Sequence, residues 1–243
     1  MKRREEELLK TIHSLSEKTG GFTKPRLILI GGYALRAFIP FSRFTRDCDF
    51  LVKANGWTLD GLKEILPTGY RVETEEKHER YGFARWIMFL HPNKLRIKVS
   101  LDLMEGAITG RKPDEIILID DVMVQNSQAV SLSIAGENVH VLVPSYLDFF
   151  IMKVVSSRAS DIRDIASLVH EKGVPSGLTE RVKQLLPYPK AFQAKIEQRI
   201  IPEIQKATFL HSWRGIFATT TYSEEDKENV VEQLNKILKN TPH

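Results

Sequence analysis

Apolar residues follow two different periods along this chain, one typical of strands and one typical of helices. Residues 27–30 form an unbroken apolar run that ends at Gly31 and Gly32, as expected for a central strand covered on both faces. Further strand-like runs, separated by turn residues, cover residues 70–74, 83–90, 95–104, 116–119, 131–134 and 139–143. The first part of the chain is therefore predicted to form a sheet.

Helices and turns are predicted around these strands. An amphipathic helix is expected over residues 2–18, and shorter helices over residues 33–38 and 55–66. Residues 91–94 are expected to join two strands as a hairpin. The stretch 116–143 is expected to be mostly extended, with Asp120 and Asp121 in a turn and residues 131–134 pairing with residues 139–143 across residues 135–138.

After Pro144 the period becomes helical. A single helix to Val169 would place Arg158 inside the apolar stripe, so a break near Ala159 is predicted, with Ser160 as the N-cap of a second helix. Later helices are predicted over residues 178–186, 189–210 and 223–238, the last one capped by Ser223. The pattern predicts an α+β fold with a mixed-sheet domain over residues 1–144 and a helical domain over residues 145–243.

Composition narrows the class of protein. The chain has 243 residues, of which 42% are hydrophobic and 27% charged, values that are ordinary for a globular protein. Its net charge of +4 and pI near 9.0 are compatible with a polyanionic partner. The single cysteine excludes an intramolecular disulfide and a multi-cysteine zinc site. No signal peptide or membrane-spanning run is recognised, so a cytoplasmic location without membrane contact is expected.

Two aspartates separated by one residue carry the clearest chemical signal. Asp47 and Asp49 flank Cys48 at the start of an apolar run, and side chains in a strand alternate, so both carboxylates are expected on one face and Cys48 on the other. Carboxylate oxygens suit hard divalent cations, which usually also bind substrate phosphates. Glycines such as Gly31 and Gly32 let backbone N–H groups approach a phosphate. The pattern therefore predicts chemistry on a nucleoside triphosphate.

These residues resemble the signature of the DNA polymerase β-like nucleotidyltransferases. The nearer resemblance is to the AbiEii-type branch, the nucleotidyltransferase toxins of toxin–antitoxin systems, in which Arg-x-Thr-x-Asp-x-Asp is common. Arg43, Thr45, Asp47 and Asp49 match that pattern here. The spacer of residues 33–46 is long for this signature, and this bears on the geometry of the loop.

The resemblance also implies a third carboxylate on a later strand. In residues 96–103 the apolar positions alternate, so Arg96, Lys98, Ser100 and Asp102 share the other face and Asp102 is expected to point out of the core. Asp102 is the residue that the resemblance selects. Glu105 and Asp60 are alternatives that lie on no alternating strand.

A second group resembles the same family. It consists of Lys153 on one predicted helix, Arg158 near its end, and Asp161 and Asp164 at the start of the next. The resemblance implies that Lys153 and Asp161 contribute to the active centre. The alternative is that acids in a first helical turn only interact with the helix dipole.

The resemblance implies transfer of a nucleoside monophosphate from an NTP to an acceptor hydroxyl by a two-metal mechanism. Asp47, Asp49 and Asp102 would hold Mg²⁺ or Mn²⁺, and the nucleotide would contact the residues Gly31, Gly32, Arg46 and Lys153. The acceptor would be an RNA such as tRNA, or a protein, and an antitoxin protein is a further expected partner. The alternative is a catalytically inactive module of the same fold that binds RNA or a partner protein. No P-loop or dinucleotide-binding glycine motif is present.

Overall fold

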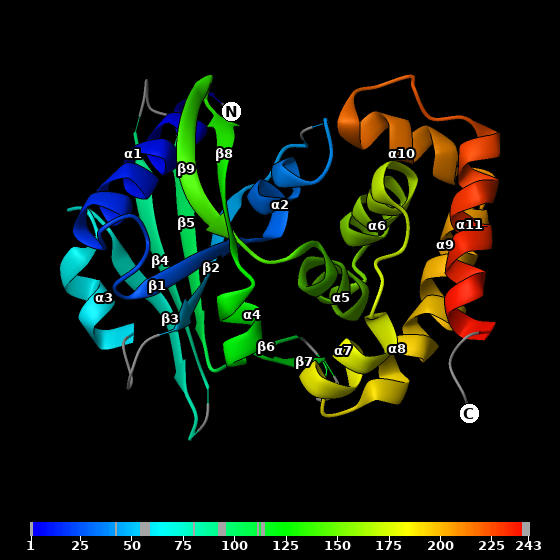
Figure 1. Ribbon diagram of the computed structural model, residues 1–243. Coiled ribbons are helices and arrows are strands. Elements are labelled where there is room, and N and C mark those ends of the chain that lie inside the picture. The colour runs from blue at the N-terminus through cyan, green and yellow to red at the C-terminus, as the bar shows by residue number, and fades with distance from the viewer. Residues whose placement is uncertain are drawn as a thin grey trace. The chain divides into compact units, whose positions relative to one another are not determined.

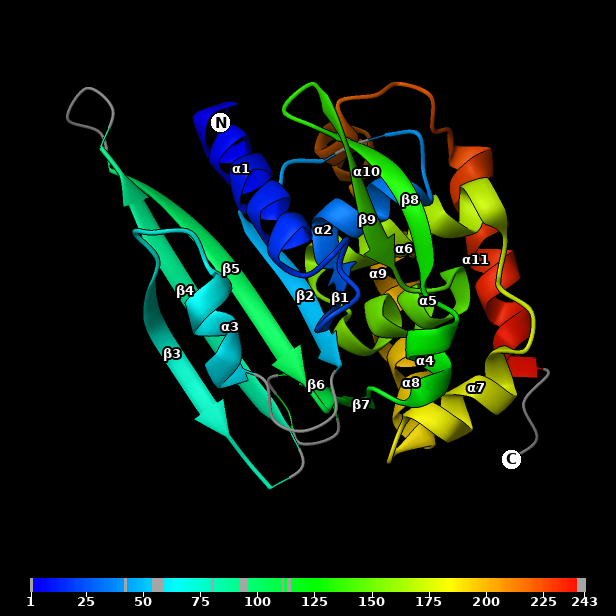
Figure 2. The same cartoon turned by 60° about the vertical axis from the view of Figure 1, so that its left-hand side comes forward.

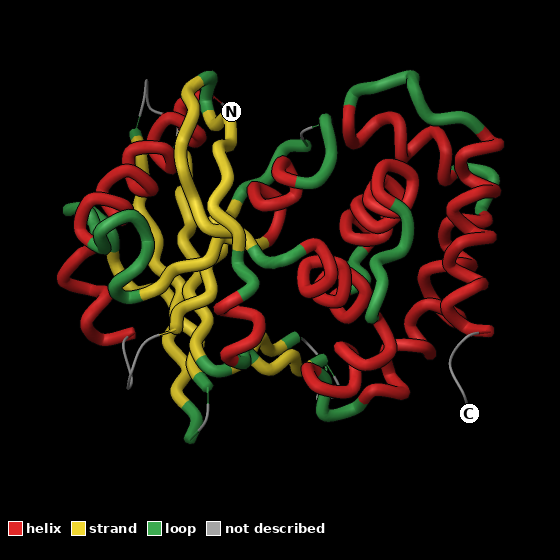
Figure 3. Tube along the Cα trace, viewed as in Figure 1, coloured by secondary structure: helices red, strands yellow, loops and turns green. Residues whose placement is uncertain are grey.

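The chain folds into two compact units in the computed structural model, which describes residues 2–41, 43–53, 59–79, 81–91, 96–110, 112 and 115–239. The sheet unit comprises Met1–Ala37, Thr45–Ile108 and Ile119–Ser145, and the helical unit comprises Phe38–Phe44, Thr109–Leu118 and Tyr146–His243. Most strands belong to the first unit and most helices to the second (Figure 3). Two short segments from the first part of the chain thus group with the helices.

A five-stranded mixed sheet forms the centre of the sheet unit (Figure 1). Its strands are β1 (Arg26–Ile30), β2 (Asp47–Lys53), β3 (Arg71–Lys77), β4 (Gly82–Leu90) and β5 (Ile97–Glu105). Their spatial order is β1-β2-β5-β4-β3, and only the β2–β5 pair is parallel. The α+β fold with a mixed sheet is confirmed.

One face of this sheet is dry. Cys48, Phe50, Leu101, Leu103 and Trp86 alternate on β2, β5 and β4, and all are fully or almost fully buried. The helices α1 (Lys2–Lys18) and α3 (Leu59–Ile65) lie along the sheet (Figure 2). The predicted amphipathic character of α1 is confirmed, because its four apolar positions are buried: Leu8, Leu9, Ile12 and Leu15.

The remaining elements of the sheet unit follow the predicted strands with one correction. The segment 116–143 is mostly extended, as predicted, but Asp120 and Asp121 do not form a simple turn, because they begin the helix α4 (Asp121–Gln125). The Asp120 carboxylate caps this helix by accepting from the Met123 N–H at 2.8 Å. Five residues are too few to show a helical period in the sequence. The β8–β9 hairpin is confirmed, with a tight turn at Ala135 and Gly136.

The bounds of the other short elements complete this region. They are α2 (Gly31–Ala34), a 3₁₀ helix (Leu35–Ala37), β6 (Ala107–Thr109), β7 (Ile116–Leu118), β8 (Gln128–Ile134) and β9 (Glu137–Val143). The start of the helix predicted from residue 55, and most of the hairpin predicted at residues 91–94, lie outside the described residues.

The helical unit begins with α5 (Tyr146–Ser156) and α6 (Ala159–Lys172), which confirms the predicted break. The N-cap is Arg158 and not Ser160, because the chain turns at Ser157, which has a positive φ of 38°. The helix then begins two residues earlier than the cap propensity of serine suggested.

Of the later helices, those predicted over residues 178–186 and 223–238 are confirmed to within one residue, whereas the one predicted over residues 189–210 is divided. The observed elements are α7 (Leu178–Leu185), α8 (Pro189–Lys195), a π-helix (Ile196–Ile200), α9 (Ile201–Gln205), α10 (Phe209–Phe217) and α11 (Glu224–Lys239). Ser223 caps α11 as predicted, since its Oγ accepts from the Asp226 N–H at 3.1 Å. Trp213 and Phe217 are buried in the core of this unit. Among the described helices, none has the length and apolar character needed to cross a membrane.

Candidate active site

The three predicted acids of the sheet unit lie on one face of two neighbouring strands. Asp47 and Asp49 occupy alternate positions of β2, and Cys48 between them is buried on the dry face. In the parallel pairing with β5, Asp49 stands opposite Asp102 and Asp47 opposite Ser100. Residues paired across strands share a face, so the expected placement of Asp102 beside the other two acids is confirmed.

The two glycines make room for side chains of this site. Gly31 has a φ of +70°, and a Cβ added to it would lie 2.2 Å from the Asp49 Oδ2 atom. A Cβ on Gly32 would lie 2.8 Å from the Thr45 side chain. The turn therefore approaches the carboxylate more closely than any other residue type would allow.

Replacing Gly31 with alanine is expected to reduce activity strongly. The new methyl group must displace the Asp49 carboxylate, and an error of about 1 Å in a reacting group costs about 100-fold in rate. Steady-state measurement of nucleotidyl transfer checks this. Gly61→Ala is the matched control, because no atom lies within 4 Å of the added Cβ and alanine favours the helix that contains it. Equal rates for the two variants would contradict the expectation.

Asp102 is engaged by an arginine from the next strand. The Arg85 Nε donates to Asp102 Oδ1 at 2.7 Å and its Nη2 donates to Oδ2 at 2.5 Å, a bidentate ion pair between directly opposed residues of β4 and β5. The Asp102 side chain is only 6% exposed. Burial raises the pKa of Asp102, while the guanidinium opposes that rise. The Asp102 side chain thus lies on the face opposite the apolar core, as expected. It is covered by Arg85, however, and is not exposed to solvent.

The geometry of the acids decides which residues suit a metal ion. The described residues contain no group of three or more His, Cys, Asp or Glu side chains arranged to hold one. Asp47 and Asp49 are half-buried on the polar face of β2. Magnesium commonly uses one or two carboxylates together with substrate phosphates and water. The pair Asp47 and Asp49 therefore fits such a cation, whereas both Asp102 oxygens accept from Arg85.

A second cluster of charged residues lies inside the helical unit. The Lys153 Nζ donates to Asp161 at 2.9 Å and to Asp164 at 2.8 Å, and Arg43 donates to both oxygens of Asp164 at 2.6 and 2.8 Å. Asp161 also accepts from the Ser156 hydroxyl at 2.7 Å. Lys153, Asp161 and Asp164 are all buried. The sequence group that resembled a family motif thus forms one hydrogen-bonded network.

The titration of Asp161 predicts a loss of stability in acid. Burial raises the pKa of Asp161, but the Lys153 charge and the hydrogen bonds outweigh it, so the pKa lies below its ordinary value of 3.8. A lowered pKa in the folded state stabilises the protein above pH 3.8, and this contribution is lost as the pH falls through the folded pKa. The difference in unfolding free energy between wild type and Asp161→Asn should shrink as the pH is lowered. Denaturant titrations at several pH values measure it, and a difference that grows in acid contradicts the assignment.

The other residues named from the sequence have varied positions. Arg46 is exposed beside Asp47 in the sheet unit. Glu105 is buried as the last residue of β5, so the expectation that it lies outside the strand was wrong. Asp60 lies on the surface and pairs with Lys63 and Lys77, which makes it unsuitable as a third site carboxylate.

The basic residues of the later helices contribute less to the surface than their number suggests. Arg181 is buried and donates to Asp148 at 2.7 Å, and Lys195 pairs with Glu115 at 2.6 Å. The Arg199 Nε donates to the Ser157 carbonyl at 2.6 Å. These three cations hold the helical unit together, so they are not free contacts for a nucleic-acid backbone.

Arg85 is the site residue that sequence reasoning missed. The sequence did contain a sign of its importance. Arg85 lies inside the apolar run of β4, and a charged residue in such a position usually has a buried partner. The sequence alone does not name that partner, since it depends on the register between β4 and β5.

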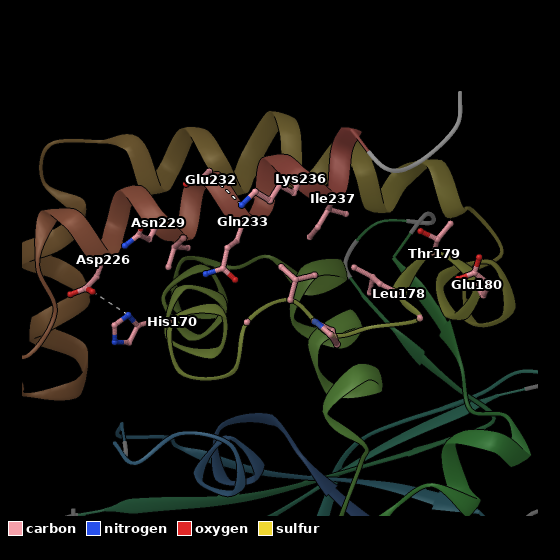
Figure 4. A pocket seen from close by; sticks show the side chains of 15 residues that line it. His170, Leu178, Thr179, Glu180, Asp226, Asn229, Glu232, Gln233, Lys236 and Ile237 are labelled. Carbon is pink, nitrogen blue, oxygen red and sulfur yellow. Dashed lines mark ion pairs between the residues drawn. The ribbon is translucent and has the colours of Figure 1, made fainter.

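A groove with a volume of about 920 Å³ lies elsewhere within the helical unit (Figure 4). Its walls come from the end of α6, the start of α7 and α11. Its charged groups contact one another, with His170 Nδ1 3.5 Å from Asp226 and Lys236 2.8 Å from Glu232. None of the predicted site residues is among the described residues that line it.

Comparison with known proteins finds a matching family model and similar solved structures. The family model described as "Nucleotidyl transferase AbiEii toxin, Type IV TA system" matches residues 19–237. A Helicobacter pylori protein named as a candidate nucleotidyltransferase is 14% identical, with 98% of this chain and 97% of that chain covered and a TM-score of 0.49. The Helicobacter pylori protein JHP933 is 15% identical, with 98% and 92% covered and a TM-score of 0.47. No curated protein matches the chain.

Proposed function

Because the chain belongs to the AbiEii family of nucleotidyltransferase toxins, we propose that it transfers a nucleoside monophosphate from an NTP to an acceptor hydroxyl. Pyrophosphate leaves as the new phosphodiester or phosphoester bond forms. The observation that carries this proposal is the pair Asp47 and Asp49, which lie on one face of β2 with Asp49 packed against Gly31. A pair of carboxylates next to a glycine turn can bind the charged phosphates of a nucleotide through a cation.

Asp47 and Asp49 are the proposed ligands of a divalent cation. Nucleotidyltransferases of this family generally use divalent metals, and we propose Mg²⁺ or Mn²⁺ because both prefer carboxylate oxygen. When bound, such a cation neutralises phosphate charge and stabilises the attacking and leaving oxygens of an in-line displacement. The chain's own contribution is to orient the two carboxylates on a rigid strand with a dry core behind it.

The nucleotide-binding roles remain predictions. Gly31 and Gly32 are proposed to contact the triphosphate through their backbone, with Arg46 as an exposed positive charge beside Asp47. Lys153 uses two of its three N–H donors on Asp161 and Asp164, so one donor is left for a phosphate oxygen. Asp161 would then act by orienting Lys153.

The expected partners follow from the family. A type IV toxin–antitoxin family implies a nucleotide substrate and an antitoxin protein. For the acceptor we propose an RNA such as tRNA, or a protein, since both offer hydroxyl groups. Of these two acceptors, the net charge of +4 favours RNA, because RNA is a polyanion.

Incorporation of labelled nucleotide tests the proposal. The full chain is incubated with each of the four NTPs in turn, labelled at the α-phosphate, together with Mg²⁺ or Mn²⁺ and a cell extract that contains RNA and protein. Label is expected on RNA or protein, and chelation of the metal should abolish it. NTP labelled at the γ-phosphate is the matched control, because that phosphate leaves with pyrophosphate. Transfer of γ-label, or of neither label, would contradict nucleotidyl transfer.

A further inference from the structure

Arg85 lies on the same face of the sheet as the predicted catalytic acids. β2, β5 and β4 are neighbours in that order (Figure 2), and Asp49, Asp102 and Arg85 form one row across them. Neighbouring strands lie about 4.8 Å apart, so the backbone of Arg85 is about 10 Å from that of Asp49. The Arg85 guanidinium thus lies on this face. Its distance from Asp47 and Asp49 is within the length of a triphosphate.

The charge of Asp102 is already neutralised by Arg85. Both carboxylate oxygens accept from the same guanidinium, and the pair is formed by directly opposed residues of two strands. A planar guanidinium and a carboxylate match in this bidentate geometry, which is stronger and more directional than a single hydrogen bond. A hard cation would have to compete with this ion pair for Asp102.

The Arg85 side chain is partly exposed, and its guanidinium carbon lies 5.9 Å from the centroid of the Phe83 ring. Of its five N–H groups, two face Asp102, and within the described part of the chain Arg85 makes no further hydrogen bond or ion pair. Its side chain is 34% exposed. The hydrogen bonds to Asp102 raise the pKa of Arg85, and the nearby charge of Asp47 raises it further. The group is therefore a cation that Asp102 holds through two N–H groups and that is partly exposed to solvent.

We propose that Arg85 binds phosphate oxygens of the nucleotide, and that Asp102 is a positioning residue that holds Arg85 and not a third metal ligand. This inference rests on the proposed function, since it needs phosphates bound on this face by a cation at Asp47 and Asp49. Asp102 fixes one edge of the Arg85 guanidinium before any phosphate binds. Phosphate binding therefore costs less rotamer entropy than it would for a free arginine. The remaining N–H groups match two oxygens of a phosphate.

Binding measurements separate the two roles of Asp102 without relying on activity. Mn²⁺ binding to the full chain is measured by electron paramagnetic resonance, first with Mn²⁺ alone and then with inorganic triphosphate added as the part common to all NTPs. Arg85→Lys and Asp102→Asn are expected to weaken triphosphate binding about tenfold, which is the loss of one bidentate contact of about 1.4 kcal/mol. Neither variant should change the affinity for Mn²⁺ alone.

The outcomes distinguish this inference from the proposed function. Asp47→Asn is expected to lose Mn²⁺ binding, and if it does not, or if wild type binds no Mn²⁺, the proposed metal site is wrong. If Asp47→Asn and Asp102→Asn both lose Mn²⁺ binding, Asp102 is a metal ligand and the present inference is wrong. Unchanged triphosphate affinity in Arg85→Lys would also overturn it.

Two further variants guard against effects on folding. Arg85→Met combined with Asp102→Asn removes both charges of the pair, so no charge is left unpaired, and it should bind Mn²⁺ normally but triphosphate weakly. Lys98→Met is the matched control, because it removes a positive charge from the Asp102 face of β5 and Lys98 pairs with Glu73. Equal loss of triphosphate affinity in Lys98→Met would mean that general charge, and not the held guanidinium, binds the phosphates.

Discussion

Asp49→Asn is expected to lower the rate of nucleotidyl transfer by about 1000-fold or more, while the fold stays intact. The amide keeps the size of the side chain, so its packing against Gly31 is preserved. It loses the negative charge that binds a divalent cation, and a bound metal supplies several kcal/mol of transition-state stabilisation, of which each 1.4 kcal/mol is tenfold in rate. Asp47→Asn should behave in the same way.

Single-turnover transfer of α-labelled nucleotide measures this effect, and circular dichroism checks the fold. Asp60→Asn is the matched control, since it removes the charge of an exposed aspartate in the same unit that pairs with the surface residues Lys63 and Lys77. Its rate should equal that of wild type. If Asp49→Asn kept full activity and still required a divalent metal, the assignment of the metal to Asp47 and Asp49 would be wrong.

Asp164→Asn is expected to destabilise the helical unit by about 3–5 kcal/mol, the usual cost of removing one partner from a buried ion pair. Asp164 is fully buried and accepts from Arg43 twice and from Lys153 once. A neutral amide in its place removes this charge, while Lys153 keeps its hydrogen bond to Asp161. Arg43, which is only 10% exposed, then loses its ion pair with Asp164.

The midpoint of denaturant unfolding, followed by the fluorescence of Trp213 in the helical core, measures the loss. Glu232→Gln is the control, because it removes an acid from a surface pair with Lys236 on α11, and surface pairs contribute little. If Asp164→Asn unfolded at the same midpoint as this control, the buried network would not contribute to the stability of the unit.

The sequence predicted most of the elements around the candidate site, because its signals there are local. The apolar run before Gly31 predicted β1, and alternation around Cys48 predicted which way Asp47 and Asp49 point. The resemblance to the AbiEii family, seen in the Asp-x-Asp pattern, is confirmed by the family match over residues 19–237. The roles assigned to individual residues stay predictions.

Errors arose where local signals were weak or competed. The short helix α4 shows no periodic pattern, and the N-cap of α6 is set by the turn at Ser157 and not by the capping propensity of Ser160. The long helix predicted over residues 189–210 contains a π-helix at Ile196–Ile200 and ends at Gln205. In each case the bounds depend on backbone geometry that a short or ambiguous sequence pattern does not specify.

The sequence by itself determined that two carboxylates share a strand face beside a glycine turn, because strand alternation and glycine geometry act over a few residues. Only the tertiary structure decided what surrounds Asp102 and Asp164, because their partners Arg85 and Arg43 come from other parts of the chain. The register between β4 and β5 sets the first pair, and the packing of residues 38–44 with the helices sets the second. Such pairings depend on contacts between distant residues, which no local pattern contains.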